Sequence, residues 1–280
     1  MDPNAPDALK EARRGLESGA RGFKLHPRSD AFGLPHPVVE QVVGMAGRER
    51  LPVLFHAGRG IPDLGESVVE MARAHPDARI ILAHAGISDL GLLAPRIAEL
   101  PNVLFDTSWW MVSDLLTLYA AVPPGQILYA SDMPYGGPRY ASMALLRCAR
   151  AVGLTPEQTA PMAGAQLARV VGGEDLLDLG PAPGPGALGA RVLAFERVIA
   201  YLTGAVQLTF RGGEPREVYA LARLACQAPD GVEHHAALRE IESYISLAEQ
   251  RLDGGAEPYA AVHAAMTAMI LAGTVAADAR

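Results

Sequence analysis

Two hydrophobic periods alternate along the first part of the chain. Runs that are apolar at every position or at every second position predict β-strands at Gly22–Leu25, Pro52–Phe55, Arg79–Ala83, Asn102–Phe105 and Gln126–Ala130. Between the strands, an apolar period of about 3.6 residues predicts helices at Pro37–Glu49, Leu64–His75, Ile87–Glu99 and Met111–Val122. Single helices between successive strands require parallel pairing with right-handed crossovers. The pattern therefore predicts an α/β layer or barrel.

The rest of the chain is predicted to be helical. Helices are expected at about Tyr140–Val152 and Pro156–Val171, followed by Gly180–Gly186, which contains only Gly, Pro and Ala and predicts a linker without helix or strand. Beyond the linker, the helical period returns at Leu188–Val206, Pro215–Cys226, Val232–Leu252 and Pro258–Ala277. We therefore expect an α/β domain at residues 1–175, a Gly/Pro linker at 176–187 and a small all-α domain at 188–280.

Composition narrows the possible partners and the compartment. The 280 residues carry 31 acidic and 24 basic side chains, which gives a net charge of −7 without any basic run. Nucleic acid and anionic membranes are therefore poor partners. The two cysteines, Cys148 and Cys226, form no CxxC motif, which favours a reducing compartment. Because the first 22 residues lack the apolar core of a signal peptide and no apolar run reaches membrane-spanning length, we expect a cytoplasmic protein.

Ionisable residues recur where the predicted strands end. Lys24, His56 and His84 close three of the apolar runs, and Asp132 follows the last one. Any one of them alone would by default be a surface or hydrogen-bonded residue. Parallel α/β barrels, however, gather their active sites at the carboxyl ends of the strands. Four such residues in register therefore predict a functional site.

This set of residues suits a divalent metal ion. Imidazole and carboxylate groups favour zinc most, with manganese or iron as further possibilities. Such an ion lowers the pKa of bound water, and the carboxylate of Asp132 is placed to accept the proton. The chemistry indicated is metal-assisted hydrolysis. A Ser-His-Asp site is disfavoured, because Ser108 and Ser131 lack the GxSxG pattern.

Several of these segments resemble a known family. Five of them resemble, in order, strands four to eight of the amidohydrolase superfamily: Gly19–Pro27, Pro52–Gly58, Ile81–Gly86, Asn102–Ser108 and Ile127–Pro134. The resemblance is to its amidohydrolase-related branch in particular. That branch includes decarboxylases, such as aminocarboxymuconate-semialdehyde decarboxylase, and lactone and amide hydrolases. Met162–Arg169 resembles the helix that closes those barrels, with Gln166 where Asn is usual. The resemblance covers about residues 1–173. It implies an incomplete TIM (β/α) barrel, strands four to eight, followed by a small all-α domain.

The resemblance also implies roles for single residues. His56 would be a metal ligand, His84 a second ligand or the group that polarises the substrate, and Asp132 a ligand and proton acceptor. Lys24 would contact substrate, although a lysine here bridges two metals in binuclear members and a structural role stays open. Apart from the resemblance, the residue type and position of Trp109 predict one wall of an apolar substrate pocket, with plain packing as the alternative. His26, two residues beyond Lys24, ranks below these residues as a site candidate.

The sequence departs from the family at its beginning. The family takes two metal ligands from an H-x-H pair on strand one, and none of the eight histidines forms such a pair. Met1-Asp2-Pro3 resembles the segment after strand three, which suggests a wrongly assigned start, a truncated paralogue or a separate chain for the first strands. We favour the wrong start.

The sequence therefore predicts a metal-dependent hydrolase. It would act on a C–N or C–O bond of a small molecule, with activity impaired in the chain as it stands. The alternatives are a decarboxylase of a small carboxylic acid on the same site and a non-catalytic scaffold or binding protein with a vestigial barrel. Association into a homo-oligomer is a further possibility.

Overall fold

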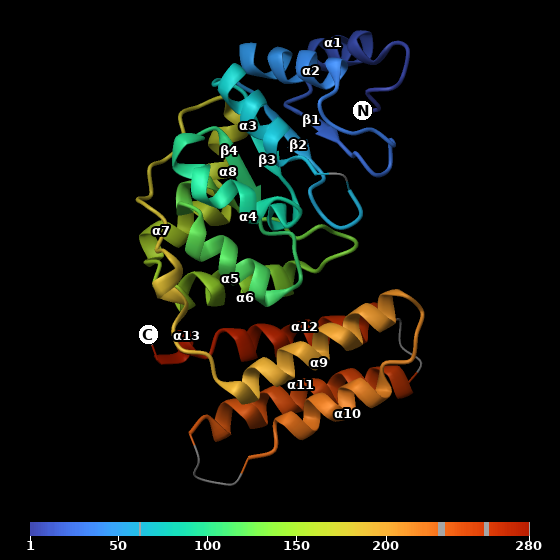
Figure 1. Ribbon diagram of the computed structural model, residues 1–280, viewed down its shortest axis with the longest axis vertical. Helices are drawn as coiled ribbons and strands as arrows, with labels where there is room; N and C mark the ends of the chain where they lie inside the picture. The colour runs from blue at the N-terminus through green and yellow to red at the C-terminus, as the bar shows by residue number, and fades with distance from the viewer. Residues whose placement is uncertain (62, 229–232, 255–257, 280) are drawn as a thin grey trace. The chain divides into compact units, whose positions relative to one another are not determined.

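The computed structural model describes residues 1–61, 63–228, 233–254 and 258–279 (Figure 1). The chain divides into two compact units. We call the first the α/β unit; it comprises Met1–Trp109, Thr117–Ala130 and Thr155–Gly184. We call the second the helical unit; it comprises Trp110–Leu116, Ser131–Leu154 and Pro185–Arg280.

The α/β unit contains a parallel five-stranded sheet. Its strands pair in chain order and are β1 (Phe23–Leu25), β2 (Pro52–Phe55), β3 (Arg79–Leu82), β4 (Val103–Asp106) and β5 (Ile127–Leu128). This confirms the parallel pairing that the alternating pattern predicts. β5 is shorter than expected, because Tyr129 N–H donates to the carbonyl of Met162 at 3.1 Å and Ala130 N–H to Thr107 Oγ1 at 3.1 Å. Both hydrogen bonds draw the chain away from its pairing with β4.

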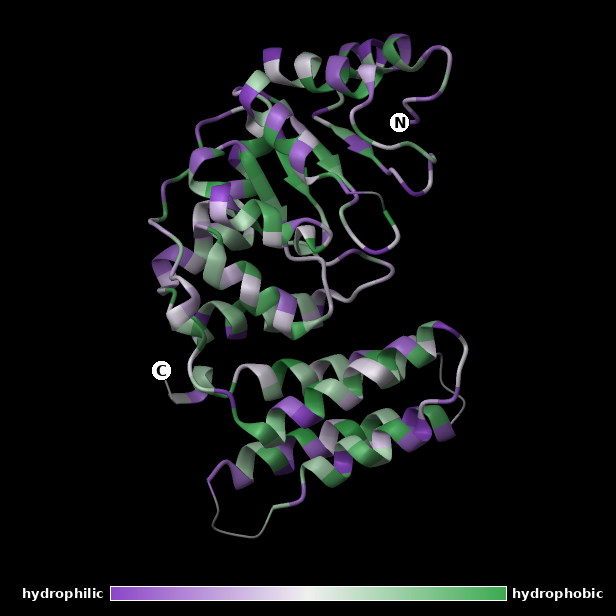
Figure 2. Cartoon of the chain, in the orientation of Figure 1, coloured by the Kyte–Doolittle hydropathy of each residue, from purple (hydrophilic) through white to green (hydrophobic). Residues whose placement is uncertain are grey.

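Most residues of the strands are apolar, as the green colour of β2 to β4 in Figure 2 shows, and most of them are buried. On one face, Ile81, Leu104 and Leu128 form a buried cluster with Val170 of α8 (Gln166–Gly172). Helices α3 (Gly65–Ala74) and α4 (Leu90–Leu93) lie on the opposite side of the sheet from α8 (Figure 1). Strands buried on both sides need no polar face, which explains their continuous apolar runs.

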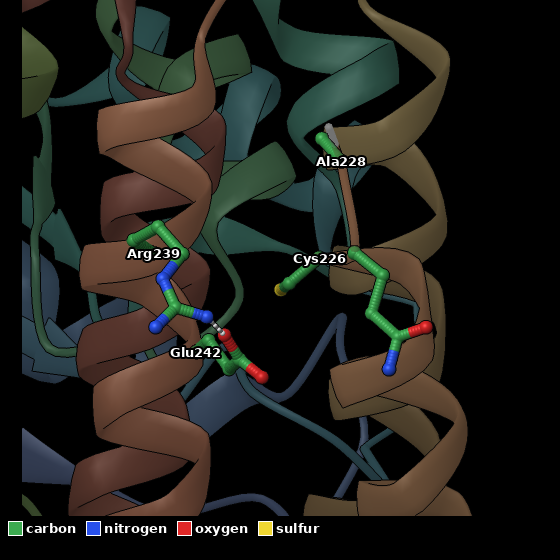
Figure 3. A pocket seen from close by; sticks show the side chains of 5 residues that line it. Cys226, Ala228, Arg239 and Glu242 are labelled. Atoms are coloured by element: carbon green, nitrogen blue, oxygen red, sulfur yellow. Dashed lines mark hydrogen bonds and ion pairs between the residues drawn. The ribbon is translucent and has the colours of Figure 1, made fainter. Parts of the chain in front are cut away.

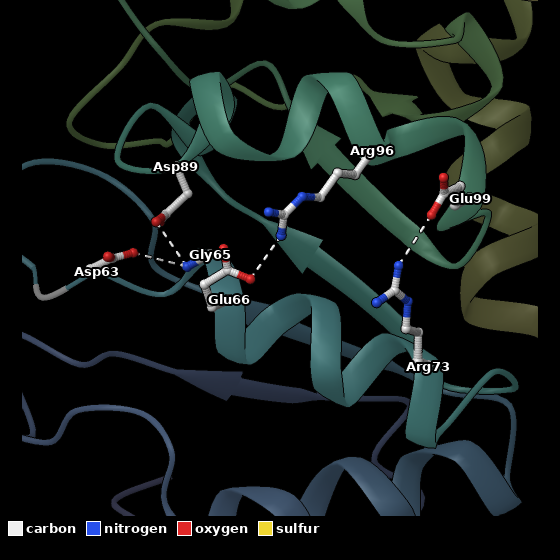
Figure 4. A network of polar contacts seen from close by, with 7 residues as sticks. All are labelled: Asp63, Gly65, Glu66, Arg73, Asp89, Arg96 and Glu99. Atoms are coloured by element: carbon white, nitrogen blue, oxygen red, sulfur yellow. Dashed lines mark hydrogen bonds and ion pairs between the residues drawn. The ribbon is translucent and has the colours of Figure 1, made fainter.

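Asp89 fixes the beginning of α3 from a distance in sequence (Figure 4). Its Oδ1 accepts the N–H groups of Leu64 at 3.1 Å and Gly65 at 2.8 Å, which are among the orphan donors of a helix start. Burial raises the pKa of this carboxyl group. The neighbouring pairs Arg96–Glu66 and Arg73–Glu99 are largely exposed, so each contributes little to stability.

The sequence pattern missed one helix and the interruptions of two others. Helix α1 (Ala8–Glu17) was not predicted, because alanines supply its only buried positions and give a weak apolar period. The stretch predicted at Pro156–Val171 is α7 (Pro156–Ala160), the π-helical turn η4 (Pro161–Ala165) and α8. The stretch predicted at Ile87–Glu99 is α4 followed by the 3₁₀ turn η2 (Ala94–Glu99). The remaining elements before Ser131 are α2 (Pro37–Arg48), η1 (His84–Gly86), α5 (Val112–Ala121) and η3 (Pro124–Gln126).

Four helices of the helical unit follow the helices predicted beyond the linker within a few residues, apart from the end of the last. They are α9 (Leu193–Phe210), α10 (Arg216–Ala225), α11 (His235–Asp253) and α12 (Pro258–Gly273). Apolar stripes such as Val198 and Leu202 of α9 and Ile241 and Ile245 of α11 are buried. The short helix α13 (Ala276–Ala279) follows α12, and no helix among the described residues is both long and apolar enough to cross a membrane.

The two units do not follow the predicted boundaries everywhere. Helix α6 (Pro138–Ala151) belongs to the helical unit, where its Arg147 donates to Thr274 Oγ1 at 2.8 Å and forms an ion pair with Asp278 at 2.9 Å. The expected linker also needs correction, because the 3₁₀ turn η5 (Pro185–Leu188) forms at its end. Before that turn, Gly184 N–H donates to the carbonyl of Ala120 at 2.8 Å. The division at 175 and 188 stays a prediction about independent folding.

Candidate functional site

Three histidines of the α/β unit meet at the carboxyl ends of neighbouring strands. His26 follows β1, His56 follows β2 and His84 lies just beyond β3. The rings of His26 and His56 stack at 3.9 Å between centroids with an interplanar angle of 12°. The His84 ring stands edge-on to that of His56 at 4.6 Å. Parallel strands bring side chains that are distant in sequence to one edge, so this placement follows from the sheet itself.

The orientation of His84 is set by the loop after β4. Its Nδ1 lies 2.8 Å from the carbonyl oxygen of Ser108, which can only accept, so this nitrogen carries the proton. In the neutral ring, Nε2 then has a lone pair, and it lies 3.0 Å from Nδ1 of His56. Two ligands of a tetrahedral zinc ion are separated by about 3.3 Å, given bonds of about 2.0 to 2.1 Å. The nitrogen pair therefore has nearly the spacing of two metal ligands.

His56 is held in its neutral form. Burial first, and after it the nearby charges of His84, His26 and Lys24, lower its pKa to about 4. Neutral imidazole is the form that binds metal ions. At neutral pH, His56 therefore needs to lose no proton before it can act as a ligand.

The backbone that carries His84 is unusual. His84, Ala85 and Gly86 all have left-handed φ values, of 59°, 58° and 56°. Non-glycine residues in this region cost energy and are found where the surroundings hold them, often at functional sites. A Cβ on Gly86 would lie 2.7 Å from the Phe105 ring, so only glycine fits there. In the amino-acid sequence, the glycine of His84-Ala85-Gly86 is the residue that could have indicated this turn.

Asp106 holds that strained turn, although its role could not be assigned from sequence. Its buried Oδ1 accepts the backbone N–H of His84 at 2.9 Å, and the N–H and hydroxyl of Ser108 at 3.0 and 2.5 Å. One carboxylate thus ties the end of β4 to the turn after β3. The signal was an acidic residue that ends an otherwise apolar strand.

Gly58 leaves room for the histidine pair. A Cβ at this buried position would lie 2.8 Å from Cδ2 of His84 and 3.2 Å from Nε2 of His56. A contact below 3.0 Å forces something to move. Gly58 is therefore required by the close approach of both rings.

The two predicted substrate contacts lie near this cluster. The half-buried Trp109 ring lies 6.2 Å from the His84 ring, and the Arg59 guanidinium lies 6.0 Å above the Trp109 ring. Lys24 is the middle residue of β1 rather than its last, and its side chain is exposed. Its charge lowers the pKa of both His26 and His56, after the larger effect of burial. Their contact with a substrate stays a prediction.

Asp132 belongs to the helical unit, so its approach to the histidines stays a prediction. It is exposed and has a left-handed φ of 54°, and its carbonyl accepts the N–H of Gly136 at 2.8 Å. Across residues 1–61, 63–228, 233–254 and 258–279, no group of three His, Cys, Asp or Glu side chains is arranged to hold a metal ion. His56 and His84 fit as two nitrogen ligands, and a catalytic zinc site commonly has three protein ligands.

A pocket in the helical unit is a weaker candidate. It has a volume of about 250 Å³ and is lined by Cys226, Gln227, Ala228, Arg239 and Glu242 (Figure 3). Burial raises the pKa of the Cys226 thiol to about 12, so the thiol is protonated and a poor nucleophile. Arg239 pairs with Glu242 at 2.8 Å. The pocket therefore shows no activated group.

Comparison with known proteins places the α/β region in a family. The family model described as Amidohydrolase matches residues 1–164. No curated protein matches the chain. A solved amidohydrolase II is 24% identical with a TM-score of 0.46, and the match covers 61% of this chain and 68% of that one. An uncharacterised TIM-barrel protein from Bordetella bronchiseptica is 13% identical with a TM-score of 0.50, and the match covers 59% of this chain and 62% of that one.

A 2,6-dihydroxybenzoate decarboxylase from Rhizobium is 16% identical with a TM-score of 0.44, and the match covers 61% of this chain and 68% of that one. The chain thus spans about two thirds of the length of these structures. The similarity confirms the predicted TIM-barrel-like fold of the α/β region, which a helical C-terminal region follows.

Proposed function

We propose a function for this chain from the premise that it belongs to the amidohydrolase family, whose model matches residues 1–164. It is a metal-dependent hydrolase that acts on a C–N or C–O bond of a small molecule. A divalent ion, zinc in the first place and manganese as the alternative, would lower the pKa of the attacking water. His56 and His84 would hold that ion.

One observation carries this proposal: the 3.0 Å approach of His84 Nε2 to His56 Nδ1. The two nitrogens lie within hydrogen-bond distance of each other, and a metal ion held between them would use a lone pair of each. Here the proton on Nδ1 of His84 leaves a lone pair on Nε2, and the depressed pKa of His56 keeps the facing ring neutral. The carbonyl oxygen of Ser108 accepts a hydrogen bond from Nδ1 of His84, as a hydrogen-bond partner of a metal-binding histidine commonly does.

The other predicted residues complete the proposed reaction. Asp132 would accept the proton of the attacking water and return it to the leaving nitrogen or oxygen. Trp109 would pack against an apolar part of the substrate, and Lys24 would bind a negatively charged part. The roles of these three residues are part of the proposal.

Decarboxylation of a small carboxylic acid is the second candidate. The observation that favours it is the positive charge of Lys24, which acts on the rings of both His26 and His56. A cation beside the metal-binding nitrogens suits a carboxylate substrate as well as it suits the product of an amide or ester hydrolysis.

The experiment is a metal titration of the full chain, followed by two assays. Binding of Co²⁺ is followed by its visible absorbance in the wild type, in His56→Gln and in the control His75→Gln. His75 pairs with Glu40 at 2.8 Å on the surface of the same unit, so its loss should leave metal binding unchanged. Hydrolysis of p-nitrophenyl acetate and release of CO₂ from 2,6-dihydroxybenzoate then separate the two reactions.

We expect metal binding in the wild type and in His75→Gln, and its loss in His56→Gln. Ester hydrolysis that requires both the metal and His56 supports the main proposal, and CO₂ release alone supports the second candidate. Equal Co²⁺ binding by all three proteins would contradict both reactions. It would favour the non-catalytic scaffold.

A further inference from the structure

A buried arginine begins strand β3 at the amino edge of the sheet. Arg79 is the first residue of that strand and is only 8% exposed. We propose that its guanidinium is the centre of a binding site for a small inorganic oxyanion, phosphate or sulfate, and that the bound anion stabilises the α/β unit. The site lies at the opposite edge of the sheet from His56 and His84, so it does not depend on the proposed function.

Arg79 lacks the contacts that buried cations normally have. Within the described part of the chain its guanidinium forms no hydrogen bond or ion pair, and its Nε lies buried without a partner. Arginine stays charged in proteins, so the group cannot become neutral by losing a proton. A buried charge is stable only when an opposite charge or a set of hydrogen-bond acceptors meets it. The missing partner is therefore a group that the described residues do not supply.

The far end of the guanidinium is the part that a ligand can reach. Nε is the buried, unpartnered nitrogen of the group, whereas Nη1 and Nη2 reach the small exposed part of the side chain. These two nitrogens present parallel N–H donors, which form the fork that binds two oxygens of one carboxylate, phosphate or sulfate. Because so little of Arg79 is exposed, the opening suits a small ion better than a phosphate group on a large molecule.

Two carboxylates act on Arg79 by their charge but do not pair with it. Asp175 instead pairs with Arg50 at 2.5 Å, which lowers the pKa of that carboxyl group. Asp77 is exposed and forms no ion pair with Arg79. Burial first, and after it the charge of Arg50, lower the pKa of Arg79, while the attraction of each carboxylate is smaller than either effect. Arg79 therefore remains short of negative charge.

The second arginine decides which class of anion fits. Arg50 lies in the turn between α2 and β2, and its Nε is also buried without a partner. Its hydrogen bond to Asp175 uses Nη2, and the side chain is 42% exposed. Two guanidinium groups repel each other unless an anion lies between them, and a tetrahedral anion has enough oxygens for both. Phosphate or sulfate therefore suits this pair better than a further carboxylate does.

The consequence of anion binding is a more stable fold. An ion that binds the folded chain and not the unfolded chain raises the melting temperature with its concentration. In parallel α/β barrels the amino edge serves stability, whereas the reaction takes place at the carboxyl edge. The anion at Arg79 is therefore a structural ligand and not a substrate.

The test compares melting temperatures of the full chain in phosphate, sulfate and chloride at equal ionic strength. Arg79→Met removes the guanidinium and keeps an unbranched apolar side chain. The matched control Arg73→Met removes an exposed arginine of the same unit, which pairs with Glu99 at 3.1 Å. Phenyl phosphate distinguishes a free ion from a phosphate group on a larger molecule.

We expect phosphate and sulfate to raise the melting temperature of the wild type and of Arg73→Met by about 2 to 4 °C, in a saturable way, and to leave Arg79→Met unchanged. In chloride, Arg79→Met should melt no lower than the wild type, because it removes an unpaired buried charge. An equal rise in all three proteins would overturn the proposal, since salts such as sulfate and phosphate stabilise proteins in general. No rise in the wild type would overturn it too, and stronger stabilisation by phenyl phosphate would refute the choice of a small ion.

A spectrum of the wild type keeps the test decisive if Arg79→Met does not fold. In the ¹H–¹⁵N spectrum of the arginine side chains, phosphate should shift the Nε–H signal of Arg79 and leave that of Arg73 in place. An unshifted Arg79 signal would overturn the proposal and make water the partner of this group. His56→Gln should respond to phosphate as the wild type does, so failure of the proposed metal site would leave this result unaffected.

Discussion

The two edges of the parallel sheet use buried polar groups in opposite ways. At the amino edge, the amide of Asn102 donates to the carbonyls of Ala72, His75 and Ala78 at 3.1 to 3.2 Å. The amide of Gln126 donates to the carbonyls of Leu100 and Val103 at 2.9 and 2.7 Å. At the carboxyl edge, the partly buried nitrogens of His56 and His84 lie 3.0 Å apart, within hydrogen-bond distance.

We expect this difference to separate stability from function. Donors matched with acceptors fix loops and leave nothing to bind a ligand. His84 lies on a turn with left-handed residues, where Asp106 accepts its N–H and Gly58 leaves room for its ring. In parallel α/β barrels the carboxyl edge carries the chemistry and the amino edge carries stability. Each substitution below should therefore affect one edge and spare the other.

The largest expected effect is at the pair His56 and His84, which we propose to bind the metal. His56→Gln should reduce metal affinity more than about 100-fold, since even the outer partners of a metal ligand are worth 10- to 100-fold. Isothermal titration with Zn²⁺ measures it. The melting temperature without metal should stay near that of the wild type. A lower melting temperature of His56→Gln together with an unchanged Zn²⁺ affinity of the folded protein would contradict the comparison between the two edges.

The next effect is at the opposite edge. Asn102→Ala removes the donors of three backbone carbonyls and should cost about 2 to 3 kcal/mol in the free energy of unfolding. Urea denaturation measures this cost. The control is Asn4→Ala, which removes an exposed amide that donates to the carbonyl of Asp30. Zn²⁺ affinity of the folded Asn102 variant should be unchanged, and a large loss would show that the edges are coupled.

A smaller effect is expected from crowding of the histidine rings. Gly58→Ala would place a Cβ 2.8 Å from His84 Cδ2 and displace that ring. We expect metal affinity to fall about 10- to 100-fold. Gly91→Ala is the control, because its Cβ would meet nothing within 4 Å. Equal Zn²⁺ affinity in the two variants would show that the spacing of the rings is not important.

The smallest effect is expected at Asp106, which holds the backbone N–H of His84 and is not one of the proposed metal ligands. Asp106→Asn keeps the shape of the side chain but weakens acceptance of the N–H of His84, and should lower Zn²⁺ affinity about tenfold. The exposed Asp77→Asn is the control for a lost negative charge. The ¹⁵N signals of His84 should shift in the first variant only. An unshifted spectrum would mean that Asp106 serves the fold alone.

Much of the fold follows from the pattern of apolar positions. The parallel strands β1 to β4 and helices α2, α3 and α6 lie within a few residues of their predicted bounds, because each carries a clear apolar period. Helix α1 was missed, since alanine contributes little to that period. The end of β5 was misplaced because Tyr129 and Ala130 bond to Met162 and Thr107, partners that are distant in sequence.

The sequence by itself determined which residue types stand at the strand ends, and hence that His56 and His84 would meet at one edge of a parallel sheet. The tertiary structure alone decided how they meet. The tautomer of His84 depends on the carbonyl of Ser108, and the strained turn depends on Asp106. Hydrogen-bond direction arises from groups brought together by folding, so a periodic pattern carries no record of it.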